Sequence, residues 1–403
     1  MFSEKSSVHL KHIAYATGYE FLCLTINIFG AILIARTVGP ARFADYTIVS
    51  TSVTTYCILL RGYQPSIASA VVVSNVGNSN SVSGNLRRIG FTVLVLISGW
   101  IMLIKFLSYF SQVGQGFYLY GTALIPAQAL TIFVSGVMQG LGNVQKWRFY
   151  IVVSTASQIP LLIIGAMWRL EVPFFIIILA LPSVIYLVVS NNFIKSSLVD
   201  IKLLKFDVSW KSSILALFAA SIAGTPLFFS KHLLPNSSFG YAVFFLSGLI
   251  ISSNLSSMFG SFLLKERFSS QTNGVSNVLL VHFLHAIPCF AYGVTFALCG
   301  YWMLDHLIEP VDSSKIPVKF ISLATIAFSI WSINFSIFEE FLLKIKMSTV
   351  LLLLVILTLE SCIFIFTEIS YTSYFILHLS MGLIVLVSNK NSYSKRNKQR
   401  YNY

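Results

Sequence analysis

The stretch VPFFIIILALPSVIYLVVSNNFI occupies residues 172–194 and carries no charged side chain. An α-helix needs about 20 apolar residues to cross the hydrocarbon core of a bilayer, so this stretch predicts a transmembrane helix. Similar stretches recur along the chain, and the charged residues gather between them. None alternates between apolar and polar residues as a transmembrane β-strand does, so we expect helices. The predicted spans are residues 13–35, 44–73, 89–110, 117–139, 149–167, 172–194, 212–233, 239–264, 276–304, 320–342, 348–367 and 372–388.

The composition excludes a soluble globular protein. Of the 403 residues, 56% are hydrophobic and 10% are charged, whereas soluble chains are about a quarter charged. The sequence contains no common nucleotide-binding, nucleophile-elbow or zinc-protease motif, and its five cysteines form no CxxC or Cys/His pattern. We therefore expect no enzymatic activity, no cofactor and no bound metal.

The basic residues predict one orientation in the membrane. Nineteen of the 27 Lys and Arg residues fall on one side of the predicted spans and seven on the other, with Arg61 inside a span. Because basic residues in short loops remain in the cytoplasm, both termini are expected there. The positive charges lie at the membrane edges, so the expected partners are membrane lipids and not nucleic acid. The seven outside residues are Arg36, Arg42, Lys105, Arg169, Lys231, Lys315 and Lys319.

The longest hydrophilic segment between spans, KSSLVDIKLLKFDVSWK at residues 195–211, separates two sets of six spans. We expect it to be a cytoplasmic linker between an N-terminal lobe of residues 1–194 and a C-terminal lobe of residues 212–388. Residues 389–403 are expected to form a basic cytoplasmic tail. The predicted fold is an all-α membrane protein with about twelve transmembrane helices in two six-helix lobes.

Prolines and glycines inside the spans predict local features. A proline within a helix removes a hydrogen bond and clashes with the carbonyl four residues earlier, so we expect kinks at these positions. Gly136 and Gly140 share a helix face and predict a close contact with a neighbouring helix. The prolines within spans are Pro65, Pro126, Pro160, Pro182, Pro226 and Pro288.

Polar residues inside several spans fall on single helix faces. In the span 320–342, polar residues recur at steps of three and four, which forms one stripe along a helix. Polar side chains are costly in hydrocarbon, so such stripes predict a hydrated cavity between the helices. The alternative is that each Ser or Thr bonds a backbone carbonyl or a neighbouring helix. The substrate-binding candidates are Arg61, Glu20, Asn27, Ser50, Thr54, Asn254, Thr325, Ser329 and Ser332.

Ionisable residues within the spans carry separate predictions, because a charge in hydrocarbon is costlier than a hydroxyl. A guanidinium pairs bidentately with oxyanions, so Arg61 suits a phosphate or carboxylate substrate. Its alternatives are an ion pair with Glu20 and an extended side chain that reaches the inner interface. Glu20 and Glu360 are candidates for coupling to a proton or a cation, because intramembrane carboxyl groups commonly serve transport.

The sequence around the first two spans resembles a known family. Ala35-Arg36-Thr37-Val38-Gly39-Pro40 is followed by Phe43-Ala44-Asp45-Tyr46. This pattern resembles the opening of the O-antigen and polysaccharide flippases of the multidrug/oligosaccharidyl-lipid/polysaccharide exporter superfamily. Ala44 stands where the family usually has glycine.

The resemblance implies a two-lobe, twelve-helix bundle around a central cavity that works by alternating access. The implied substrate is an oligosaccharide linked to undecaprenyl diphosphate, moved across the bacterial inner membrane and coupled to protons or sodium. Other polysaccharide-assembly proteins are possible partners. One alternative is a drug/cation antiporter of the same superfamily, with Glu20 and Glu360 as ion sites. Another is a polysaccharide polymerase, although these usually have a large periplasmic loop and the longest outside loop here is residues 305–319.

Overall fold

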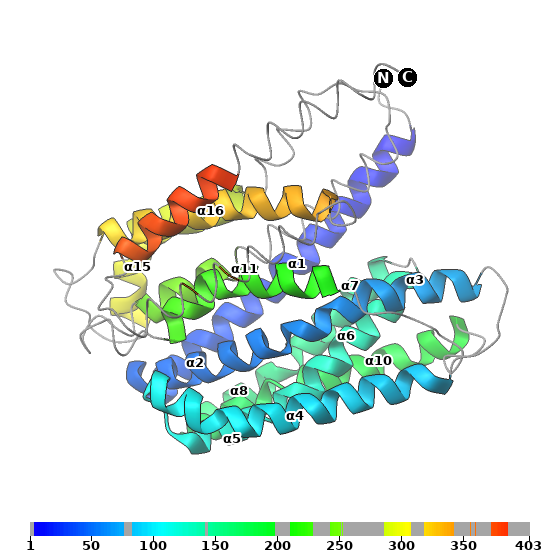
Figure 1. Ribbon diagram of the computed structural model, residues 1–403, viewed down its shortest axis with the longest axis horizontal. Helices are drawn as coiled ribbons and strands as arrows, with labels where there is room; N and C mark the ends of the chain where they lie inside the picture. The colour runs from blue at the N-terminus through cyan, green and yellow to red at the C-terminus, as the bar shows by residue number, and fades with distance from the viewer. Residues whose placement is uncertain are drawn as a thin grey trace. The chain divides into compact units, whose positions relative to one another are not determined.

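The computed structural model describes residues 4–75, 83–141, 144–197, 210–228, 242–250, 252, 286–307, 318–341, 355, 359 and 372–385. Their regular elements are helices, and no strand occurs in these ranges (Figure 1). This confirms the all-helical class. Two compact units divide the chain: unit 1 is Met1–Leu217 with Leu307–Glu309, and unit 2 is Phe218–His306 with Pro310–Tyr403. Most of the predicted linker and all of the predicted basic tail lie outside the described residues.

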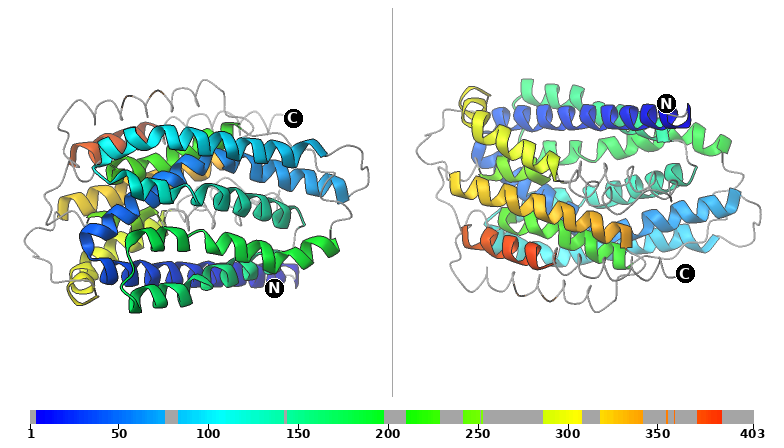
Figure 2. Two further views of the ribbon diagram at one scale, coloured as in Figure 1. Left: turned by 90° about the horizontal axis from the view of Figure 1, so that it is seen from below. Right: turned by 90° about the horizontal axis from the view of Figure 1, so that it is seen from above.

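Unit 1 is a bundle of helices that run roughly parallel or antiparallel to one another (Figure 2). Within it α6 packs against α3 and α10, and α1 packs against α7 and α8. The elements are α1 (Glu4–Val38), α2 (Pro40–Cys57), the 3-10 helix η1 (Ile58–Gly62), α3 (Tyr63–Asn75), α4 (Ser83–Ser111), α5 (Gln115–Gly121), α6 (Leu124–Gly140), α7 (Val144–Ala156), α8 (Gln158–Met167), α9 (Val172–Ile178) and α10 (Leu181–Ser197). The helix α11 (Trp210–Phe228) begins in unit 1 and continues into unit 2.

Three helix breaks in unit 1 fall four residues before a proline. A proline ring clashes with the backbone carbonyl of the residue four positions earlier, and proline has no N–H to donate to that carbonyl. The regular helix therefore ends there. These breaks confirm the kinks that the sequence predicts at these prolines. The pairs are the Thr122 cap of α5 with Pro126, the α7 end Ala156 with Pro160, and the α9 end Ile178 with Pro182.

The remaining span prolines behave in different ways. Pro65 follows η1, whose 3-10 turns separate α2 from α3, so this span is also interrupted. Pro226 lies inside α11, which continues through it to Phe228. Pro288 stands in the first turn of α15 (Ile287–Leu307), where its missing N–H is not needed. The described residues thus show no helix break at Pro226 or Pro288.

Among the described residues, four helical segments are long and apolar enough to cross a membrane. Three of them combine two helices across a proline break. In the α4 segment few side chains are buried, and Met102 is 81% exposed, as expected for a helix against lipid. The segments are Ile89–Ser111, Gln115–Gly140, Lys146–Met167 and Val172–Ile194, which cover four of the predicted spans.

The contact of α3 with α6 depends on two glycines. A Cβ atom added at Gly136 would lie 2.9 Å from the Cβ of Ile67, and one added at Gly140 would lie 2.6 Å from the backbone oxygen of Ala68. Real Cβ atoms keep greater distances, so these helix axes can approach closely only without side chains at the two positions. The predicted close contact at Gly136 and Gly140 is confirmed.

Unit 2 contains most of α11, a helical segment at residues 242–250, α15, α16 (Val318–Phe341) and a helical segment at residues 372–385. Its aromatic core includes the buried Trp331. The ring of Trp331 lies 4.9 Å from that of Phe218 in a T-shaped arrangement, and its Nε1 donates a 3.1 Å hydrogen bond to the carbonyl of His378. This polar contact lets a large indole be buried without an unsatisfied N–H.

Candidate functional site

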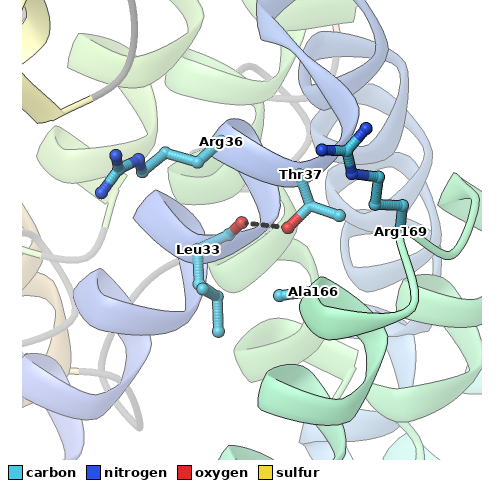
Figure 3. A pocket seen from close by; sticks show the side chains of 5 residues that line it. All are labelled: Leu33, Arg36, Thr37, Ala166 and Arg169. Carbon is cyan, nitrogen blue, oxygen red and sulfur yellow. Dashed lines mark hydrogen bonds between the residues drawn. The ribbon is translucent and has the colours of Figure 1, made fainter.

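A cavity of about 440 Å³ lies in unit 1 where the end of α1 meets the end of α8 (Figure 3). Leu33, Arg36 and Thr37 line it from the last turns of α1, and Ala166 and Arg169 line it from α8 and the turn that follows. The cavity thus has two arginines and one hydroxyl beside two apolar side chains. Its volume is within the range of small-molecule sites.

The α1 side of the cavity is set by a tight helix–helix corner. Gly39 adopts φ 81°, a left-handed conformation that glycine reaches without strain, and its N–H donates to the carbonyl of Ala35 at 2.9 Å. Pro40 then starts α2, where its fixed φ suits the first helical position. The Thr37 hydroxyl donates to the Leu33 carbonyl at 2.7 Å, so its proton is already used within α1.

The α8 side is a Schellman turn. The N–H of Arg169 donates to the Ala166 carbonyl at 3.2 Å, and the N–H of Leu170 donates to the Gly165 carbonyl at 2.9 Å. This turn places Arg169 at the left-handed position, with φ 50°, that glycine most often fills. For a residue with a Cβ, that conformation costs about 1–2 kcal/mol. The turn therefore holds an arginine where glycine would be less strained.

The two arginines give the cavity a positive potential. Both side chains are exposed, and neither makes an ion pair with a residue that the structure describes. Each helix C-terminus contributes about half a negative charge, so the ends of α1 and α8 together offset about one of the two positive charges. In Figure 3 the two guanidinium groups lie on either side of Thr37 and point apart. Because both are exposed, rotation of either side chain can bring its group toward a ligand.

The predicted site residues in unit 1 are not gathered at this cavity. Asn27 in α1 is exposed, and its Oδ1 accepts a 3.1 Å hydrogen bond from Nε2 of the buried Gln158. Ser50 donates to the Thr47 carbonyl within α2 at 3.1 Å, and Thr54 on the same helix is exposed. Ser50 therefore shows the backbone bonding that the sequence leaves as an alternative.

The predicted stripe in unit 2 lies on α16 and is largely buried. Thr325, Ser329 and Ser332 are all less than 9% exposed. The Ser329 hydroxyl donates to the Thr325 carbonyl at 2.8 Å, and the Ser332 hydroxyl lies 3.4 Å from the sulfur of Cys289 on α15. A Cβ added at Gly293 of α15 would overlap the Thr325 side chain, so the two helices approach closely there. The Ser329 and Ser332 hydroxyls thus join one helix to itself or to its neighbour, whereas the buried Thr325 hydroxyl has no hydrogen-bond partner among the described residues.

Four further candidates lie outside what the structure describes. These are the side chains of Arg61, in η1, and Glu20, in α1, together with residues Asn254 and Glu360. Within the described residues no group of three His, Cys, Asp or Glu side chains could hold a metal ion.

No family model and no curated protein matches the sequence. A solved structure titled "protein A" is similar to the chain, with a TM-score of 0.56 and 15% sequence identity. The similarity covers 96% of this chain and 96% of that one. At this level of identity the likeness shows a shared fold over nearly the whole length.

Proposed function

We propose that this chain is a flippase of the bacterial inner membrane that moves an oligosaccharide linked to undecaprenyl diphosphate. In this proposal about twelve helices form two lobes around a central cavity, and both termini are cytoplasmic. Alternating access of the cavity to the two membrane faces carries the head group across, and a proton or sodium gradient drives the cycle. The reaction breaks no covalent bond, which agrees with a sequence that contains no common catalytic motif.

The observation that carries the proposal is the corner between α1 and α2. The residues that resemble the polysaccharide flippases, Ala35 to Tyr46, form this corner, and Arg36 within them lines a cavity that a second arginine also lines. A cationic cavity at a helix end fits a substrate that carries a diphosphate. The alternative, a drug/cation antiporter, would use the carboxylates of Glu20 and Glu360 to bind its cation.

The proposal predicts a defect in surface polysaccharide when the gene is deleted in its own host. Lipid-linked repeat units are then expected to accumulate on the cytoplasmic face, because they are made there and are no longer exported. The measurement is surface glycan by gel and staining, together with extraction of the lipid-linked precursor. Restored glycan from a plasmid copy is the control. Normal glycan with altered drug sensitivity would instead favour the antiporter, and accumulation of single repeat units already exported to the outer leaflet would favour the polymerase.

A further inference from the structure

We infer that His378 in unit 2 is the residue that takes up the coupling proton of the transport cycle. It lies in the middle of the helical segment at residues 372–385, inside a predicted span, and its side chain is fully buried. The inference rests on the proposed function for the transport cycle, but the uptake of a proton by His378 is a property of unit 2 alone. It names a coupling residue other than Glu20 and Glu360.

The burial of His378 is the first observation. A histidine ring carries two polar nitrogens, and an apolar side chain of similar size would fill the same space without the cost of burying polar atoms. Ionisable residues inside a span are rare, and histidines among them belong to proton relays in pumps and transporters. Histidine suits that role because an unperturbed imidazole gains and loses its proton within the physiological range of pH.

Two aromatic rings beside His378 suit a positive charge. The ring centroid of Tyr374, on the same helix, lies 4.4 Å from that of His378, and the ring of Trp331 on α16 lies 6.3 Å away. The face of an aromatic ring attracts a cation, most strongly where water is excluded. Both rings are held in place, since the Tyr374 hydroxyl donates to the carbonyl of Ile222 on α11 at 3.1 Å and Trp331 donates to the carbonyl of His378.

A buried amide near His378 is the independent observation. Asn334 on α16 is fully buried, and its Nδ2 donates a 2.9 Å hydrogen bond to the carbonyl of Gly382, one helical turn after His378. Its Oδ1 is also buried and accepts no hydrogen bond from the residues that the structure describes. An acceptor left in this state is costly. A protonated imidazole has two N–H donors where the neutral ring has one, so protonation of His378 supplies a further donor within one turn of this acceptor.

The groups around His378 favour a proton over sodium as the ligand. Hard cations such as sodium prefer oxygen ligands, above all carboxylates, whereas an imidazole nitrogen binds a proton. Among the described residues, α16 places Trp331 and Asn334 against this segment and α11 places Ile222 against it, and none of the three carries a charge. Tyr374 is the titratable neighbour on the same helix. The inference therefore also selects between the two coupling ions of the proposed function.

The first experiment follows tryptophan emission of the detergent-purified, full-length protein between about pH 5 and pH 8, where histidine changes its charge. Indole emission falls when an adjacent imidazole becomes charged, so Trp331 reports the charge on His378. A second pair, Trp302 and His306 on α15, stacks at 5.1 Å and would give the same signal. All samples therefore carry Trp302→Phe.

We expect the emission to fall as the pH is lowered, and we expect His378→Gln to remove this change. Trp331→Phe, which removes the reporter and keeps the histidine, should remove it as well. Constant emission over the whole range would overturn the inference, as would an unaltered change in either variant. The melting temperature of each sample shows whether the variant is folded, and the titration of the protein that keeps both residues tests the inference without them.

The second experiment measures surface polysaccharide in cells that carry His378→Gln or His378→Arg. Glutamine never takes up the proton and arginine never releases it, so both are expected to reduce surface polysaccharide at least tenfold at normal protein levels in the membrane. His306→Gln is the matched control, because this histidine is exposed on α15 and should be dispensable. Normal glycan in His378→Gln would refute the coupling role. The deletion experiment remains independent: normal glycan there would refute the proposed function without changing the emission result.

Discussion

Replacement of Arg61 by alanine is expected to reduce surface polysaccharide at least tenfold, while replacement by lysine retains part of it. Arg61 falls within the predicted span 44–73, and its backbone belongs to η1, the break between α2 and α3. A guanidinium in a span costs about 2.5–3.5 kcal/mol on insertion scales, so a chain that keeps it there has a use for the charge. Lysine keeps the charge but not the paired hydrogen bonds to a diphosphate.

The free-energy cost of inserting an arginine into the membrane also separates a loss of transport from a loss of membrane insertion. Because alanine inserts into a membrane more readily than arginine does, the Arg61→Ala protein is expected at normal levels in the membrane. An immunoblot of the membrane fraction checks this. The control is Arg42→Ala, which removes an exposed arginine just before the same span and should leave the glycan unchanged. Full activity of Arg61→Ala would remove Arg61 from the substrate site.

Local rules in the sequence were enough to predict much of the fold. The helix breaks before Pro126, Pro160 and Pro182 have a local cause. Each proline removes one backbone hydrogen bond and introduces one steric clash, and both effects reach only the preceding turn of the helix. The glycine pair at Gly136 and Gly140 predicts close packing because no side chain separates the helix from its neighbour. Pro226 shows the limit of such rules, since α11 continues through it to its last turn.

The candidate site was less predictable, because it depends on which helix ends meet. In the sequence, Arg36 belongs to the motif shared with the polysaccharide flippases, whereas Arg169 appears only as one of the seven basic residues on the same side of the membrane. Nothing local shows that α1 and α8 end side by side, or that Arg169 takes a left-handed turn position where glycine is usual. The sequence does show a basic residue at the end of each of two predicted spans. Only the packing of the helix bundle shows that these two residues line the same cavity.

The polar stripe on α16 shows the same limit. Thr325, Ser329 and Ser332 are all buried, but so are Ala327 and Trp331 on other faces of the helix, so burial does not single out the striped face. The period does not say whether that face meets water or another helix. Ser332 contacts Cys289, and Ser329 bonds its own helix. A Ser or Thr hydroxyl can form a hydrogen bond with water in a cavity, with its own helix or with a neighbouring helix. The spacing of these residues alone therefore cannot distinguish a hydrated cavity from a helix contact.

The largest loss of stability is expected from leucine at Gly140. A Cβ there would lie 2.6 Å from the backbone oxygen of Ala68 and 2.6 Å from the Cβ of Val71, so even alanine cannot be accommodated without movement of α3. Overpacking in a well-packed interior costs about 1–3 kcal/mol, and leucine adds three further carbons to a contact with rigid backbone, so we expect about 3 kcal/mol or more. The surrounding cluster includes Ile67, Val134 and Met138, all fully buried.

The measurement is the melting temperature and the monodisperse fraction of the detergent-purified protein. Gly90→Leu is the matched control, since a Cβ at Gly90 on α4 meets no atom within 4 Å. The milder Gly140→Ala should be partly rescued by Val71→Ala, which removes the Cγ contact at 2.9 Å but neither the contact with the Val71 Cβ nor the clash with the Ala68 carbonyl. Full rescue would show that the side chain, and not the backbone, sets the distance between α3 and α6. Equal melting temperatures for Gly140→Leu and Gly90→Leu would contradict the close contact itself.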